Sequence, residues 1–115
     1  MTNRNNSIKI SRGDSLILTH TVKDTNGSAV DITGSTPYFT VKTDNTLPDS
    51  GSTIQKIGAL TDAAGGECTF TLIPTDTAIT VDIEYYYDIE IYFSSTDVRT
   101  SESGTFKVIQ DVTKT

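Results

Sequence analysis

The sequence predicts an all-β fold, an antiparallel β-sandwich of seven or eight strands. Thr (21 copies), Ile (12) and Val (7) greatly outnumber Ala (5), and β-branched side chains favour strands over helices. Residues 84–93 alternate strictly between two chemical faces, which is the period of a half-buried strand. Turn signals, and not helical patterns, separate the apolar segments.

Seven segments carry the strand pattern. We expect strands at residues 7–11, 15–23, 36–43, 54–60, 67–73, 84–93 and 98–103, the last continuing past Gly104 to residue 109. Gly104 is expected to mark a bulge or a bend, and Pro37 to mark a strand beginning or an edge position. This spacing fits an immunoglobulin-like sandwich better than βαβ units, although the paired cysteines and core Trp of antibody domains are absent.

The connections are defined by turn chemistry. Asn26-Gly27 predicts a tight turn, since both residues tolerate positive φ. A second turn is expected at 61–66, and Pro74 is suited to the start of a single helical turn over 74–79. Residues 44–53 form the longest irregular segment, which we expect to be mobile because it is polar and rich in Pro, Gly and Ser.

The segment 84–93 is expected to be the central strand, with one face in the core. The predicted core consists of Tyr85, Tyr87, Ile89, Ile91, Phe93, Phe70, Leu72, Phe106 and Val108. The strand at 15–23 is expected to place Leu16, Leu18, His20 and Val22 on one face.

The chain length of 115 residues predicts one domain over 1–115, with flexible ends at 1–6 and 110–115. The net charge is −6 and the acidic residues are spread along the chain, which argues against a nucleic-acid partner and a polybasic membrane site. There is no apolar run of membrane-spanning length and no apolar signal core at the start. The single cysteine, Cys68, excludes an intramolecular disulfide and is expected to be buried.

Five segments carry motifs in a recognisable order. They are IKISRGDS at 8–15, VKDTNGSAVDITG at 22–34, GECTFTL at 66–72, YYDIEI at 86–91, and GTFKV at 104–108 followed by DVT at 111–113. In this order they resemble the N-terminal domain of baseplate upper proteins and related tail, neck or head accessory proteins of tailed bacteriophages. The resemblance covers most of the chain outside 44–53, and Ala29 stands where the family commonly has Pro.

The resemblance implies a non-enzymatic structural component of a tailed-bacteriophage virion, at the baseplate, tail, neck or capsid surface. It implies contacts with other phage structural proteins in a symmetric homo-oligomer or ring, and location in the virion after synthesis in the bacterial cytoplasm. One alternative is an adhesin-like binding module for a host glycan or protein, which the lack of Trp disfavours. A small hydrolase is disfavoured because one His and one Cys supply no nucleophile–base set.

Two motifs resemble functional sites but have simpler explanations. Arg12-Gly13-Asp14 spells an integrin-type tripeptide, yet Gly and Asp are ordinary turn residues. His20 is the only histidine and is predicted to lie in the core or at its rim. A pH-sensing role remains its alternative, and His20 with Cys68 cannot hold a metal unless carboxylates join them.

Two groups of polar residues could suggest further chemistry. Asp24, Asn26 and Asp31 are spaced like the start of a calcium loop, but no acid follows at the twelfth position, so a turn is favoured. Asp88 and Glu90 could form the carboxylate pair of a glycoside hydrolase, but we favour solvated or interface-facing acids. We predict no catalytic, cofactor-binding or metal-binding residue and no cofactor.

The predicted partner surface centres on Tyr86 and Tyr92. Both lie on the polar face of the segment 84–93, and exposed tyrosines are enriched in protein interfaces because they combine large area with a polar tip. Asp49 and Ser50 in the segment 44–53 are the second candidates, through ordering on contact.

Overall fold

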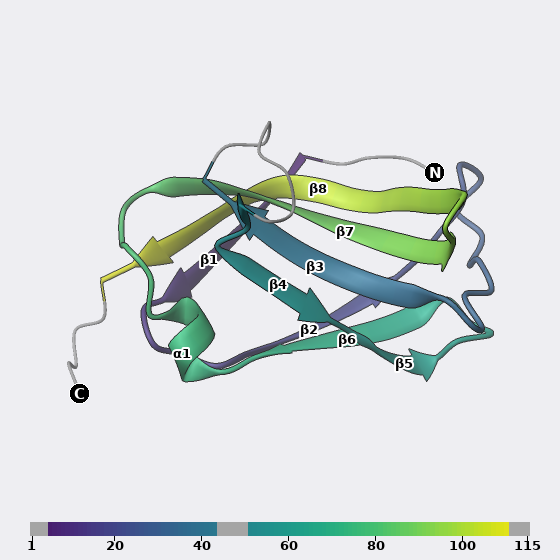
Figure 1. The fold of residues 1–115 in the computed structure, drawn as a ribbon, viewed down its shortest axis with the longest axis horizontal. Coiled ribbons are helices and arrows are strands. Elements are labelled where there is room, and N and C mark those ends of the chain that lie inside the picture. The colour runs from purple at the N-terminus through teal and green to yellow at the C-terminus, as the bar shows by residue number, and fades with distance from the viewer. Residues whose placement is uncertain (1–4, 44–50, 111–115) are drawn as a thin grey trace.

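Two sheets make up nearly all of the regular structure (Figure 1). A computed structural model describes residues 5–43 and 51–110. Its elements are β1 (Asn5–Ser11), β2 (Leu16–Thr21), β3 (Thr36–Lys42), β4 (Ile54–Ile57), β5 (Ala59–Asp62), β6 (Glu67–Leu72), α1 (Pro74–Thr77), β7 (Glu84–Ser94) and β8 (Asp97–Ile109). The sheets have the orders β1-β8-β7-β3-β4 and β2-β6-β5. The predicted β-sandwich is therefore confirmed, with eight strands in the described part of the chain.

Strand β7 is the middle strand of the larger sheet. It pairs antiparallel with β8 on one side and β3 on the other. Burial alternates along it, so that Tyr85, Tyr87, Ile89 and Ile91 face the core. The predicted central strand is confirmed, and so is its inward face from Tyr85 to Ile91.

The core lies between the two sheets. Its buried apolar residues are Ile10, Val22, Ile32, Phe39, Val41, Ile54, Cys68, Phe70, Leu72, Tyr85, Tyr87, Ile89, Ile91, Phe106 and Val108. The ring of Phe39 in β3 lies 5.8 Å from that of Phe70 in β6, so aromatic contacts join the sheets. The same ring lies 5.5 Å from Tyr87 and 6.1 Å from Phe106.

One predicted core residue, Phe93, is only partly buried. The pairing of β7 with β8 is irregular between Tyr92 and Ser94, which leaves Phe93 as the extra residue. The guanidinium of Arg99 lies 4.6 Å from the centre of its ring. Phe93 therefore packs at the edge of the core, and one face of its ring contacts the guanidinium of Arg99.

The prediction of one strand over 54–60 is wrong, because the segment divides at Gly58. β4 before it belongs to the five-stranded sheet, and β5 after it belongs to the three-stranded sheet. A Cβ at Gly58 would lie 2.7 Å from Cε1 of Phe70. Only glycine lets the chain pass this close to the Phe70 ring as it crosses between the sheets.

Strand β8 is one continuous strand, and its irregular position differs from the predicted one. It runs unbroken through Gly104, and the irregularity falls at Ser101, since Ile89 pairs with Glu102 and Glu90 with Thr100. Of the bulge or bend expected at Gly104, the bulge is therefore wrong. A bulge re-aims the side chain of the extra residue, and here it directs Ser101 toward the smaller sheet.

Strand β1 pairs in parallel with β8, so one pairing departs from the antiparallel pattern. β1 begins at Asn5, within the range 1–6 that was expected to be flexible. Residues 1–4 and 111–115 of the expected flexible ends lie outside the described residues, as does 44–50 of the expected mobile segment.

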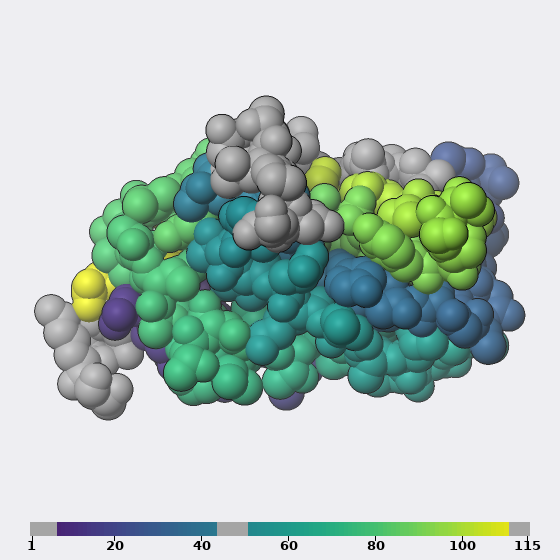
Figure 2. Space-filling view, in the orientation of Figure 1, coloured from purple at the N-terminus to yellow at the C-terminus, as the bar shows by residue number. Residues whose placement is uncertain are grey.

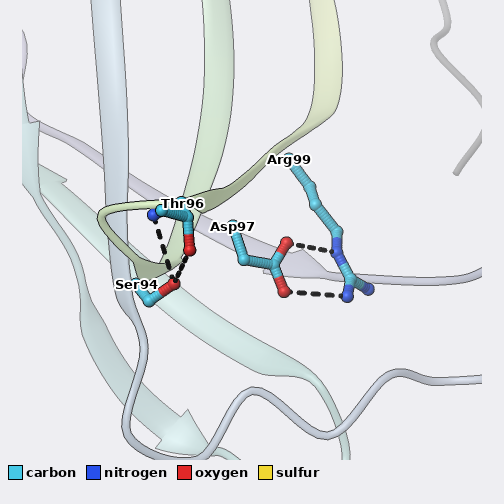
Figure 3. Close-up of polar contacts among 4 residues, drawn as sticks. All are labelled: Ser94, Thr96, Asp97 and Arg99. Carbon is cyan, nitrogen blue, oxygen red and sulfur yellow. Dashed lines mark hydrogen bonds and ion pairs between the residues drawn. The ribbon is translucent and has the colours of Figure 1, made fainter.

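The helical turn predicted over 74–79 is present but shorter, because α1 ends at Thr77. The helix α1 begins at Pro74, and Asp76 accepts a hydrogen bond from the Ile73 N–H at 2.8 Å. At the β7–β8 hairpin the Thr96 N–H donates to the Ser94 hydroxyl (Figure 3). Arg99 donates two hydrogen bonds to Asp97 in the same hairpin (Figure 3).

Candidate functional site

The outer face of the five-stranded sheet carries three tyrosines. We call the residues Tyr38, Gln55, Tyr86, Glu90 and Tyr92 the tyrosine face. They come from the neighbouring strands β3, β4 and β7, and Figure 2 shows β3 (blue) between the teal strands and the β7–β8 hairpin. Because β7 alternates between core and outside, its even-numbered residues 86–92 point away from the core.

Tyr92 lines a pocket together with residues of the two neighbouring strands β3 and β4. Tyr38, Gln55, Glu90 and Tyr92 line a pocket of about 180 Å³, which we call the tyrosine pocket. The rings of Tyr38 and Tyr92 meet edge to face, with centroids 5.0 Å apart and planes at 68°. Glu90 is the register partner of Tyr38. The sequence analysis missed Tyr38 and Gln55, although Tyr38 is readable as an outward residue of the strand 36–43.

Tyr86 lies on the same face but apart from the tyrosine pocket. It is the register partner of Lys42 and Thr105 and is 38% exposed. Tyr92 lies six positions further along β7, which is about 20 Å along an extended strand. The two predicted interface tyrosines therefore share one face without touching, and the other candidates, Asp49 and Ser50, lie outside the described residues.

A second polar cluster joins the two sheets around His20. The Nε2 atom of His20 lies 2.6 Å from the Ser101 hydroxyl, and its Nδ1 atom lies 3.8 Å from a carboxylate oxygen of Glu102. The Tyr87 hydroxyl donates to the other Glu102 oxygen at 2.7 Å. Burial lowers the pKa of His20, and the Glu102 charge partly offsets this by raising it. The prediction of a core or rim histidine is confirmed.

The order Ser101, His20, Glu102 resembles a nucleophile, base and acid, which the sequence analysis did not foresee. A nucleophile must reach its substrate, but Ser101 is only 8% exposed. The 3.8 Å between His20 and Glu102 also exceeds hydrogen-bonding distance. The cluster thus connects β2 to β8 through hydrogen-bonded polar side chains.

The remaining candidate motifs have structural explanations. Gly13 adopts a φ of 83° in the turn that contains Arg12-Gly13-Asp14. One carboxylate oxygen of Asp24 accepts hydrogen bonds from the backbone N–H groups of Asn26 and Ser28, at 2.9 and 3.0 Å. Both predicted turns are confirmed.

The structure also shows the surroundings of two acids, one from the calcium-loop alternative and one from the glycosidase alternative. Asp31 accepts hydrogen bonds from the Thr33 hydroxyl and N–H, which lower its pKa. Asp88 shares the outer face of β7 with Glu90 and is partly buried. Residues 5–43 and 51–110 contain no group of three or more His, Cys, Asp or Glu side chains that could hold a metal ion.

Cys68 is fully buried at the register position opposite His20. Burial raises the pKa of its thiol to about 11, with a smaller contribution from Glu67. The thiol is therefore protonated at neutral pH, as expected for a buried structural cysteine.

Comparison with known proteins identifies the family. The family described as the BppU N-terminal domain matches residues 1–114. The chain belongs to this family. The resemblance to baseplate upper proteins is thereby confirmed, and BppU N-terminal domain membership implies a structural protein of a phage baseplate or tail, and hence a virion component.

Solved structures support the fold of this BppU N-terminal domain. The immunoglobulin-like domain of mouse leukocyte-associated immunoglobulin-like receptor 1, solved as a strand-swapped dimer, is 19% identical with a TM-score of 0.52. The alignment covers 92% of this chain and 91% of the receptor domain. The immunoglobulin-like architecture is thus confirmed.

Two further results are negative. No curated protein sequence matches the chain significantly. Among the residues that the structure describes, no helix is both long and apolar enough to cross a membrane.

Proposed function

We propose that this protein is a non-enzymatic structural component of a tailed-phage virion that docks onto another virion protein through the tyrosine face. The observation that carries the proposal is the outward placement of Tyr38, Tyr86 and Tyr92 on the central strands of a sheet whose other face is the core. Membership of the BppU N-terminal domain family supports the virion assignment.

The position of these tyrosines suits a docking surface. β7 and β3 are interior strands, each hydrogen-bonded on both sides, so their side chains are held on a rigid platform. Aromatic residues on such a platform bury large area with little loss of conformational freedom. Repetition of this contact in a symmetric ring or homo-oligomer is part of the proposal.

A phage carrying the altered gene tests the proposal. Tyr86→Ser combined with Tyr92→Ser should reduce the amount of this protein in purified particles, measured by quantitative mass spectrometry. Truncation of an aromatic at an interface centre commonly costs about 2 kcal/mol or more of binding energy. Thermal unfolding of the same purified variant distinguishes lost docking from lost folding.

Ile17→Ser is the matched control, because Ile17 is 70% exposed on the three-stranded sheet. It removes a large exposed side chain from the opposite sheet and should leave incorporation unchanged. Equal incorporation of the double tyrosine variant and the unaltered protein would contradict the docking proposal. Sedimentation of the purified protein tests the homo-oligomer, and a glycan array tests the adhesin alternative.

A further inference from the structure

The tyrosine pocket combines one carboxylate with two aromatic rings. Glu90 is half-buried, and its carboxylate forms no hydrogen bond or ion pair with any residue in the described part of the chain. Tyr38 and Tyr92 flank it. A carboxylate that has lost part of its hydration without gaining a partner is ready to pair with a cation.

The fourth lining residue strengthens this preference. One side-chain N–H of Gln55 donates to the Thr40 hydroxyl at 3.3 Å, and the carbonyl oxygen of the same amide can accept a hydrogen bond. Among residues 5–43 and 51–110, no Lys, Arg or His lines the pocket. The described lining thus includes one anion, two electron-rich rings and an amide oxygen, each of which can contact a cation.

We propose that the tyrosine pocket receives an arginine side chain of the virion protein onto which this domain docks. The inference rests on the proposed function and specifies the chemistry of its partner. A planar guanidinium can pair with the Glu90 carboxylate through two N–H groups while stacking against a tyrosine ring. The pocket of about 180 Å³ has room for such a group. A neutral sugar would leave the Glu90 charge uncompensated.

The charge of the chain points to a different protein and not to a second copy as the source of the arginine. Each copy carries a net charge of −6, so a cationic segment of a different protein is attracted to the Glu90 carboxylate more strongly than a second copy is.

Nuclear magnetic resonance of the isotope-labelled full chain tests the pocket directly. The probe is N-acetyl-arginine-N-methylamide, titrated at constant ionic strength. It should shift the Gln55 side-chain amide and the Glu90 carboxyl resonance. The neutral isostere N-acetyl-citrulline-N-methylamide should bind at least about fivefold more weakly, because it lacks the charge.

Glu90→Gln should weaken arginine binding by at least about fivefold. Glu84→Gln is the matched control, since Glu84 lies on the same face of β7, is exposed, and does not line the pocket. It changes the net charge equally and should change binding less than about twofold. Thermal unfolding of both variants confirms that each is folded.

Three results would overturn the proposal. They are equal binding of the citrulline and arginine probes, equal losses in Glu90→Gln and Glu84→Gln, or shifts at the pocket with a panel of neutral monosaccharides but none with arginine. Particle incorporation of Glu90→Gln separates the two proposals. Normal incorporation of Glu90→Gln beside reduced incorporation of Tyr86→Ser with Tyr92→Ser would reject only the arginine pocket. Normal incorporation of both would reject the docking face itself.

Discussion

The Nε2 atom of His20 and the hydroxyl oxygen of Ser101 lie 2.6 Å apart, which links β2 of the smaller sheet to β8 of the larger one. This contact exists because Ser101 is the extra residue of a bulge and because His20 faces inward from β2. Burial lowers the pKa of His20, so the folded protein holds this imidazole in its neutral form more strongly than the unfolded chain does.

The stability of the protein should therefore depend on pH through His20. Its contribution is complete above about pH 6.5, the ordinary pKa of histidine, and is lost as the pH falls below that value, because the unfolded chain then binds more protons. We expect the free energy of unfolding, measured by urea melts, to decrease between pH 7.5 and pH 5. Glu102 keeps part of the stability by attracting the protonated ring.

His20→Gln should reduce this pH dependence, since it removes the titrating group. The lowered pKa of Asp31 acts in a separate window near pH 4 and below, where acid removes its stabilising hydrogen bonds. A pH dependence between 7.5 and 5 that is the same in His20→Gln would contradict the assignment to His20.

The buried tyrosines of β7 provide a matched pair. Tyr87 donates to the Glu102 carboxylate at 2.7 Å, whereas Tyr85 donates to the Thr80 carbonyl at 3.3 Å. Hydrogen bonds to charged groups contribute about 1.5–3 kcal/mol and neutral ones about 0.5–1.5 kcal/mol. Tyr87→Phe should therefore destabilise more than Tyr85→Phe in denaturant unfolding, and the reverse order would contradict the pairing with Glu102.

The crossing at Gly58 should tolerate no side chain. Gly58→Ala places a Cβ against Phe70 and 3.1 Å from Cγ of Pro37, and such overpacking typically costs about 1–3 kcal/mol. Ala59→Ser, the next residue along and exposed, should change stability by less than about 0.5 kcal/mol. Combining Gly58→Ala with Phe70→Leu should cost less than the sum of the two single changes, because the smaller side chain relieves the clash. Additive losses would contradict the contact.

Cys68 should be unreactive in the folded protein. Its thiol is buried and its pKa is raised to about 11, so the reactive thiolate is scarce at pH 8. We expect a thiol reagent such as Ellman's reagent to react slowly with the native protein and rapidly after unfolding in guanidinium chloride. Equal rates in the two states would show that β6 opens readily.

Local patterns were sufficient to predict the long strand and its two faces. Alternation from Glu84 to Phe93 depends only on the two-residue period of an extended chain, so the inward Ile89 and the outward Tyr92 could both be read directly. The Asn26-Gly27 turn and the Pro74 helical turn were equally predictable, because each depends on the φ preference of its own residues.

The sequence alone determined the strand content, the faces of β7, the buried cysteine and the family of this protein. The tertiary structure decided which strands share a sheet, the division at Gly58, the contact of His20 with Ser101, and the gathering of Tyr38 and Gln55 around Glu90. The reason is the range of the forces involved. Strand periodicity arises within a few residues. The contacts around Glu90 and His20, by contrast, join residues 35 to 81 positions apart (Gln55 to Glu90, and His20 to Ser101), and they depend on how both sheets pack around Phe39.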